Sequence, residues 1–261
     1  MPEVEREKEI VVREVSTLEE YDGCIRLQRE AFEMPEIEIS PRRHFIVTHL
    51  AGGWTLGAFA GDEMMGFVHH LIALRGADEI IGYSHMMAVA REYQNRGVGA
   101  HLKWAQRERA LSEGRTFIRW TWDPMQARNA HFNLNRLGVV VRSYAVNFYG
   151  TDSSTPNEAT GARIGLDSDR LFAEWELDSG RVKSFAAGSA HAPQSAPVAT
   201  IEIPPNWNAL VQADAERARR ELGRVRRQFQ EAFAARLVCA GFERSNERPR
   251  YLLYEEKSAE Y

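Results

Sequence analysis

The sequence predicts an α+β fold, with one large domain and a smaller C-terminal addition. Short apolar runs typical of strands alternate with longer stretches of helical spacing, giving the order β-α-α-β-β-β-α-β-α-β-β followed by β-α-β. Apolar residues make up 44% of the 261 residues and charged residues 27%, the balance of a soluble globular protein. No internal repeat interrupts this order, so a repeat architecture is excluded.

The elements expected in the first half follow from spacing and capping signals. Ser16 and Thr17 stand three residues ahead of Glu19 and Glu20, a pattern typical of a capping box at a helix start. Gly114 stands where a helix is expected to end. The elements expected here are strands at 10–15, 54–60, 65–74 and 83–89, and helices at 17–32, 41–50 and 97–113. Alternation along the last of these strands places Tyr83, His85, Met87 and Val89 on one face.

The second half predicts further elements and the domain boundaries. The elements expected are strands at 117–122, 139–149, 170–177, 200–203 and 251–254, and helices at 124–137 and 207–239, the last stopped by Gly241. Residues 150–168 are interpreted as a loop. The domains expected are a disordered lead-in at 1–9, a main domain at 10–177, a linker or mobile loop at 178–197, and a C-terminal β-α-β extension at 198–261 packed on the same sheet.

Composition excludes several classes of function. The 33 Lys and Arg residues against 37 Asp and Glu give a net charge of −4, which argues against a nucleic-acid partner. The arginine-rich stretch 217–227 is interleaved with glutamates and is interpreted as a solvated helix face. Cys24 and Cys239 lack the spacing of a disulfide scaffold or a zinc finger, and no metal site is expected. No segment approaches the roughly 18 apolar residues of a membrane span, and the charged N-terminus is unlike a secretory signal, so no membrane partner and a cytoplasmic location are expected.

One segment combines the features of an anion-binding loop. It joins the strand at 83–89 to the following helix, and its residues are Gln94, Asn95, Arg96, Gly97, Val98, Gly99 and Ala100. The glycines permit tight backbone geometry, and the first amides of a helix lack partners within the helix. The helix dipole places about half a positive charge there, to which Arg96 adds its own, so the loop suits a pyrophosphate. It matches neither a Walker loop nor the G-x-G-x-x-G pattern of dinucleotide-binding proteins.

These residues resemble a known family. Gln94-x-x-Gly97-x-Gly99-Ala100 after the strand end Met87-Ala88-Val89 resembles the (Q/R)-x-x-G-x-(G/A) motif of the GNAT N-acyltransferase superfamily. The run from Asn129 to Arg136-Leu137-Gly138 resembles the second cofactor motif of that family. The resemblance covers about the first 180 residues, and 136–150 with 167–177 is similar to a group of GNAT proteins without assigned substrates. It implies a mixed, mostly antiparallel sheet flanked by helices and splayed between the strands 83–89 and 117–122, with the C-terminal β-α-β as an additional element.

The resemblance also implies a cosubstrate and its binding residues. Acetyl-CoA, or another short acyl-CoA such as succinyl-CoA, would donate its acyl group to the amine of a small molecule or amino acid by direct attack in a ternary complex. The backbone of Met87, Ala88 and Val89 would hold the pantetheine arm, and the amides from Gln94 through Ala100 would hold the pyrophosphate. Asn129 and Phe132 would flank the pantetheine on its other side.

The candidate catalytic residues are few. His85 is the candidate base, because it precedes Val89 by four residues on a strand where a family member carries a catalytic histidine, and a buried structural role is the alternative. The tyrosine that usually serves as general acid is replaced by Leu134, which leaves Tyr144 and Tyr149 as weaker candidates. His69 and His70 are neighbours on a strand and face opposite sides, so they are expected to be structural or to line the substrate site, not to bind one metal together.

Three functional interpretations remain open from the sequence. The first is a catalytic N-acetyltransferase acting on a small-molecule amine, and the second is a catalytic protein acetyltransferase. The third is a non-catalytic acyl-CoA-binding or interaction module with a GNAT fold, which Leu134 favours. The acceptor, the acyl chain and the oligomeric state stay open, with a homodimer among the alternatives.

Overall fold

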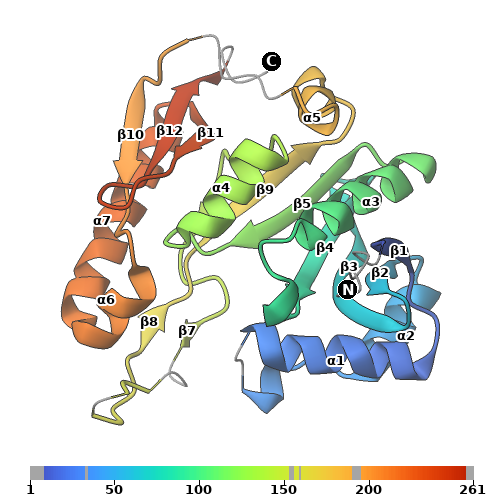
Figure 1. Ribbon diagram of the computed structural model, residues 1–261. Helices are drawn as coiled ribbons and strands as arrows, with labels where there is room; N and C mark the ends of the chain where they lie inside the picture. The colour runs from blue at the N-terminus through green and yellow to red at the C-terminus, as the bar shows by residue number, and fades with distance from the viewer. Residues whose placement is uncertain (1–8, 33–34, 153–155, 159, 190–194, 257–261) are drawn as a thin grey trace, which may run out of the picture. The chain divides into compact units, whose positions relative to one another are not determined.

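The protein consists of two compact units, residues 1–116 and residues 117–261 (Figure 1). The computed structural model describes residues 9–32, 35–152, 156–158, 160–189 and 195–256. Apart from Glu9, the expected lead-in at 1–9 lies outside the described residues. No described helix is long and apolar enough to cross a membrane.

The first unit is built on four antiparallel strands in the order β1-β2-β3-β4. Its strands are β1 (Val11–Glu14), β2 (Trp54–Ala60), β3 (Glu63–Arg75) and β4 (Glu79–Val89). Its helices are α1 (Leu18–Phe32), α2 (Arg42–Leu50) and α3 (Val98–Ser112), with single 3-10 turns at Glu36–Glu38 and Arg91–Tyr93. Every strand and helix expected before residue 114 is therefore confirmed, with ends that differ by a few residues.

Helices cover both faces of this sheet. On one face, α1 and α2 pack Leu27 and Phe45 against Phe67 of β3. On the other face, α3 packs Val98 and Leu102 into a core formed by β2 and β3. Because its first turn is anchored in that core, the N-terminus of α3 has a fixed position beside the end of β4.

The start of α1 has the capping box that the sequence predicts. The Thr17 hydroxyl accepts a hydrogen bond from the Glu20 amide at 3.2 Å. The Glu20 carboxylate in turn accepts from the amides of Ser16 at 2.8 Å and Thr17 at 3.2 Å. These bonds satisfy amides that the first turn of a helix leaves free.

The described part of the second unit holds three antiparallel strands of one sheet, a separate three-stranded antiparallel sheet and a short hairpin. One sheet has the order β5-β9-β6, from β5 (Phe117–Trp122), β9 (Arg170–Glu176) and β6 (Tyr144–Ala145). The other has the order β10-β12-β11, from β10 (Ala199–Glu202), β12 (Arg250–Glu255) and β11 (Leu237–Glu243). The hairpin pairs β7 (Thr151–Asp152) with β8 (Leu166–Asp167). The helices are α4 (Ala127–Arg136), α5 (Gly180–Ala186), α6 (Trp207–Ala213) and α7 (Ala215–Ala234).

These elements confirm the predicted fold class, a mostly antiparallel arrangement of strands flanked by helices with additional C-terminal structure. The expected splay between the strands 83–89 and 117–122 would involve both units, and it stays a prediction.

The prediction of one long strand at 139–149 is wrong. Val140 forms a single antiparallel bridge with Glu174 of β9, and Val141 forms one with Cys239 of β11. Only Tyr144 and Ala145 then continue as a strand, paired with β9. The valines do adopt extended backbone, as β-branched residues favour, but two different sheets share their hydrogen bonds, so no continuous ladder forms.

The prediction of a single helix at 207–239 is also wrong. It breaks at Asp214, whose side chain accepts a hydrogen bond from the Arg217 amide at 2.9 Å and so caps a second helix. Arg236 has a left-handed φ of 59°, and the chain after it is β11. Gly241 therefore lies inside a strand, and the C-terminal element is β-α-α-β-β. The apolar run at 237–242 is too short for periodicity to separate helix from strand.

Two segments expected to lack regular structure contain some. The loop at 150–168 holds the β7–β8 hairpin. The segment at 178–197 holds α5, which begins at a Ser179 cap. Its buried Arg181 donates hydrogen bonds to the carbonyls of Leu134 at 3.2 Å, Gly138 at 3.0 Å and Ala240 at 2.6 Å. The domain boundaries at 177 and 198 stay a prediction.

Candidate functional site

The loop between β4 and α3 has two residues in the left-handed backbone region. Asn95 has a φ of 63°, and Gly97, which is the N-cap of α3, has a φ of 85°. Residues other than glycine and asparagine rarely adopt this conformation. The local sequence therefore fits the sharp turn that brings the chain from the strand into the helix.

This turn leaves a run of backbone amides without partners. Within the described part of the chain, the amides of residues 95–99 donate no hydrogen bond. The amides at the two ends of the predicted segment are occupied, because Gln94 donates to the Arg91 carbonyl at 3.3 Å and Ala100 to the Gly97 carbonyl at 2.9 Å. Consecutive free amides at a helix N-terminus are suited to bind an anion, and the exposed Arg96 adds a full positive charge.

Neighbouring side chains hold this loop in place. The Gln94 side-chain amide donates to the Val89 carbonyl at 3.1 Å, which ties the loop back to the end of β4. Val98, which is only 1% exposed, anchors the first turn of α3. Gly66 lies opposite Val89 in the sheet, and a Cβ added there would come within 2.8 Å of the Ala88 carbonyl. The loop is thus preorganised, so an anion would not have to order it.

A β-bulge changes the expected orientation of His85. In the β3–β4 pairing, His69 lies opposite Met86 and His70 lies opposite Ser84, so His85 is the extra residue. His85 contacts His44 of α2, whereas Met87 packs on the α3 side of the sheet. The expectation that His85 and Met87 share a face is therefore wrong, because the bulge shifts the alternation by one residue.

The bulge brings His85 into a cluster of three histidines from three elements. His44 lies on α2, His69 on β3 and His85 on β4, and one ring nitrogen of each lies within 4.8 Å of the others. The ring centroids are 5.0 Å apart for His44 and His69, and 5.3 Å for His44 and His85. No spacing in the sequence indicates this cluster, because His44 is 25 and 41 positions from the other two.

The environment keeps all three imidazoles neutral. Burial lowers the pKa of His44. Burial, with repulsion from His44 and His85, lowers the pKa of His69 to about 2. Surrounding protein atoms and the neighbouring His44 lower the pKa of His85 to about 4, although its side chain lies at the surface. Each ring therefore has a free lone pair at neutral pH.

His70 lies on the opposite face of β3, as predicted. Its ring stacks on Trp54 with a centroid distance of 4.0 Å, and its Nδ1 lies 3.2 Å from the Gln106 amide nitrogen of α3. Gln106 also accepts a hydrogen bond from the buried Lys103 at 2.7 Å. These contacts indicate a structural role for His70 beneath α3.

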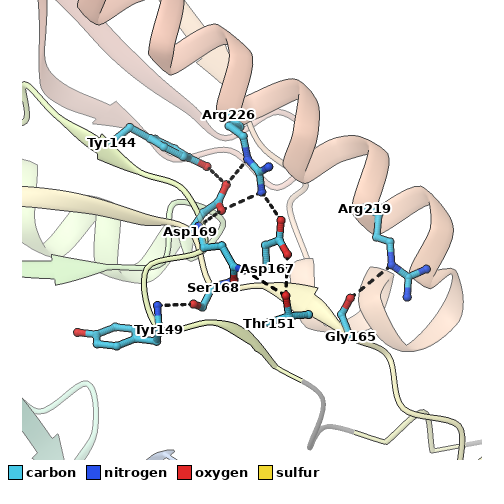
Figure 2. A network of polar contacts seen from close by, with 10 residues as sticks. Tyr144, Tyr149, Thr151, Gly165, Asp167, Ser168, Asp169, Arg219 and Arg226 are labelled. Carbon is cyan, nitrogen blue, oxygen red and sulfur yellow. Dashed lines mark hydrogen bonds and ion pairs between the residues drawn. The ribbon is translucent and has the colours of Figure 1, made fainter.

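The two candidate acids of the second unit differ in their surroundings (Figure 2). Tyr144 donates to the Asp169 carboxylate at 2.5 Å, and Arg226 contacts the same carboxylate at 2.8 Å. Burial and the bond to Asp169 raise the pKa of Tyr144 far above its usual range, which disfavours it as a proton donor. Tyr149 is 60% exposed, and its hydroxyl lies 3.2 Å from that of Thr121.

The other predicted residues of the second unit lie on α4. Asn129 is exposed, and Phe132 is half-buried. Leu134, at the position of the usual tyrosine, is fully buried. The binding roles of Asn129 and Phe132 stay predictions.

Comparison with known proteins identifies the class of this domain. Residues 19–138 match the model of the acetyltransferase (GNAT) family. A putative GNAT acetyltransferase from Desulfovibrio desulfuricans has a similar structure, with a TM-score of 0.51 and 17% identity over 65% of this chain and 99% of that one. The ribosomal-protein-S18-alanine N-acetyltransferase from Escherichia coli gives a TM-score of 0.50 and 13% identity over 65% of this chain and 94% of that one.

A third similar structure is the NatC complex bound to Gag peptide and CoA, with a TM-score of 0.50 and 13% identity over 64% of this chain and 98% of the matched one. A comparison with curated proteins found no match. The domain match and the shared fold confirm the resemblance for this part of the chain: residues 19–138 carry a GNAT acetyltransferase domain.

Proposed function

We propose that the protein is an N-acetyltransferase that moves the acetyl group of acetyl-CoA to the amine of a small molecule or amino acid. The observation that carries this proposal is the run of free amides at residues 95–99, at the start of α3 in a domain of this family. The NatC complex, which is similar in fold, is bound to CoA.

The loop suits the donor's pyrophosphate in charge and in shape. The two phosphates present several acceptor oxygens to amides that have no other partner in the described chain, and Arg96 supplies a countercharge. A helix N-terminus contributes about 0.3–1 kcal/mol to binding an anion, and each hydrogen bond to a charged group about 1.5–3 kcal/mol. In the proposed complex, the pantetheine arm runs along the backbone of Met87, Ala88 and Val89 at the end of β4.

The proposed reaction needs a general base for the attacking amine, and it does not need a strong general acid. The neutral amine attacks the thioester carbonyl, the C–S bond breaks, and CoA leaves as a thiolate. His85 accepts the proton that the attacking amine releases, because its imidazole is neutral and lies at the surface beside the bulge. Holding both substrates together lowers the barrier further by removing the entropy cost of their encounter.

The leaving group makes a strong general acid dispensable. A thiol has a pKa of about 8.5, so a thiolate leaves near neutral pH without being protonated first. This agrees with the buried Leu134 at the usual tyrosine position and with the phenol of Tyr144, which donates to Asp169. Tyr149 stays the only candidate acid of the sequence analysis whose hydroxyl is not bonded to a carboxylate among the described residues.

The proposal also covers the acceptor amine and the cellular location of the protein. A small-molecule or amino-acid amine is the acceptor we favour, and the N-acetyltransferase from Escherichia coli, which by name acts on a ribosomal protein, makes a protein amine the alternative. Both cysteines are free and buried, which fits a cytoplasmic protein.

Calorimetric titration with CoA tests the donor site, and release of free thiol from acetyl-CoA in the presence of an amine panel tests the transfer. We expect CoA to bind, and His85→Ala to lower turnover at least tenfold near pH 7 without changing CoA affinity. His49→Ala, on the exposed side of α2, is the matched control. No binding at millimolar CoA would refute the donor site, and unchanged turnover would remove His85 from catalysis.

The second candidate is a module that binds acyl-CoA without transferring the acyl group. The buried Leu134 favours it, since the usual acid cannot act there. Tight CoA binding without thiol release across the amine panel would support this candidate over the enzyme.

A further inference from the structure

We propose that His44, His69 and His85 form a binding site for one divalent transition-metal ion of the zinc class. The three side chains come from α2, β3 and β4 of the first unit, and each offers one ring nitrogen to a common centre. The inference does not depend on acyl transfer, because it concerns the affinity of these three nitrogens for a metal. A neutral imidazole has one lone pair, so metal binding by His85 and its proposed role as the base exclude each other in the same molecule.

The three ligand nitrogens are near enough for side-chain rotation to bring them around one metal ion. They lie within 4.8 Å of one another. Zinc–nitrogen bonds of about 2.0–2.1 Å in a tetrahedral site place two ligand nitrogens about 3.3 Å apart. Small side-chain rotations close this difference, since His85 lies at the surface and His44 lies near the start of a helix.

Two of the nitrogens are otherwise unexplained. The Nε2 atoms of His44 and His69 are both buried and have no hydrogen-bond partner among the described residues. His69 is fully buried, so its Nε2 has lost its hydration without a replacement. Buried polar atoms are nearly always satisfied, and a metal ion at the cluster would satisfy both nitrogens at once.

A neighbouring hydroxyl fixes the orientation of His69. Its Nδ1 lies 2.7 Å from the Thr55 hydroxyl. When Nδ1 carries the proton and donates to Thr55, Nε2 is the nitrogen that keeps a lone pair for a metal, which is the arrangement that holds metal-binding histidines. Phe45 packs against the same ring at a centroid distance of 4.7 Å and limits its rotation.

The donor set selects the class of metal. Three imidazole nitrogens favour Zn²⁺ and its neighbours in the transition series, whereas Mg²⁺ and Ca²⁺ prefer oxygen ligands. The His85 side of the cluster lies at the surface and provides an entry path and an open fourth position. Structural zinc sites have four protein ligands, whereas a site with three protein ligands leaves its fourth position to water or another small ligand.

The test is metal binding by the full-length protein after removal of any affinity tag and treatment with a chelator. Zn²⁺ binding is measured by calorimetry, and Co²⁺ is used as a spectroscopic probe of coordination. We expect one Zn²⁺ per chain and the intense visible absorption of tetrahedral cobalt. Loss of an outer hydrogen-bond partner lowers metal affinity about 10- to 100-fold, so loss of a ligand in His44→Ala or His85→Ala should cost at least as much.

His49→Ala is the matched control, because His49 lies on the same helix and outside the cluster, and it should bind Zn²⁺ like the unmodified protein. Thr55→Val should show a smaller loss than either ligand variant. The two ligand variants separate loss of a ligand from misfolding. His85 lies at the surface, so His85→Ala should keep the circular dichroism spectrum of the unmodified protein while losing Zn²⁺ affinity. Absence of Zn²⁺ binding below about 100 μM would overturn the proposal. Zn²⁺ binding by His44→Ala and His85→Ala that is as tight as in the unmodified protein would also overturn it.

Discussion

Replacing Gly97 by alanine tests whether the backbone of the loop, and not its side chains, holds the acyl donor. Gly97 has a φ of +85°, and a Cβ at this position would meet only the His101 ring, at 3.8 Å. Space is therefore sufficient, and the whole cost comes from the left-handed backbone. That conformation costs a non-glycine residue about 1–2 kcal/mol.

Gly114→Ala provides a control with the same strain at the other end of α3. Gly114 has a φ of +78°, and a Cβ there would meet nothing within 4 Å. Both variants should therefore lose about 1–2 kcal/mol of unfolding free energy, measured by urea denaturation. Relief of this strain displaces the amides of residues 95–99 in Gly97→Ala but not in Gly114→Ala, and loss of one hydrogen bond to a charged group, about 1.5–3 kcal/mol, corresponds to at least a tenfold loss in CoA affinity.

Calorimetric titration with CoA decides between the outcomes. The CoA affinity of Gly97→Asn should lie between those of the unmodified protein and Gly97→Ala, because asparagine tolerates the left-handed region better than other non-glycine residues. Equal CoA affinity in the unmodified protein and in Gly97→Ala, together with a loss of stability well below that of Gly114→Ala, would refute the role of the amide loop, because the strain would then have been relieved by displacing the amides.

Three further outcomes follow from contacts described above. Tyr144→Phe should leave turnover unchanged while lowering stability by about 1.5–3 kcal/mol, because it removes a hydrogen bond to the Asp169 carboxylate and no proton donor; thiol release and urea denaturation measure the two effects. Arg181→Ala should cost about 3 kcal/mol or more in urea denaturation, since it leaves buried carbonyls unpaired and opens a cavity. Burial alone would raise the pKa of Glu20, but hydrogen bonds from two amides and the ion pair with Arg13 lower it, so its stabilisation is complete above the unfolded-state pKa of about 4.3 and is lost as the pH falls through the folded-state pKa. Glu20→Gln should therefore melt lower than the unmodified protein at pH 7, and the difference should shrink in acid.

Each of these outcomes has a result that contradicts it. Reduced turnover in Tyr144→Phe at unchanged CoA affinity would restore Tyr144 as the acid. An Arg181→Ala protein as stable as the original would mean that water replaces the guanidinium. A melting difference for Glu20→Gln that is constant from pH 7 to pH 3 would show that the carboxylate charge contributes nothing.

The sequence predicts the first unit well because its signals are local. The capping box at Thr17 and Glu20, the glycine at 97 and the alternation of β2 and β3 each depend on a few neighbouring residues, and the structure confirms the elements they indicate. The free amides of the loop are equally predictable from the sequence, since unpartnered amides at a helix start follow from the position of the helix alone.

The rest of the site depends on contacts that no local pattern carries. A single extra residue in β4 turns His85 toward α2, and periodicity cannot show a bulge before the pairing is known. The histidine cluster likewise appears only when three separate elements pack together. In the second unit, the run Val140–Val141 has the composition of one strand, but its two residues bond to different partners.

Those two valines have a consequence for any attempt to shorten the protein. Val141 exchanges both backbone hydrogen bonds with Cys239, at 2.9 and 3.0 Å, one residue after Val140 does the same with Glu174. Deleting the C-terminal residues from 198 onward would remove Cys239, the backbone partner of Val141, and Ala240, one of the three carbonyl partners of Arg181. The C-terminal residues are thus hydrogen-bonded to the rest of the second unit, and a truncated protein would report on damaged folding and not on the loss of a separate accessory domain.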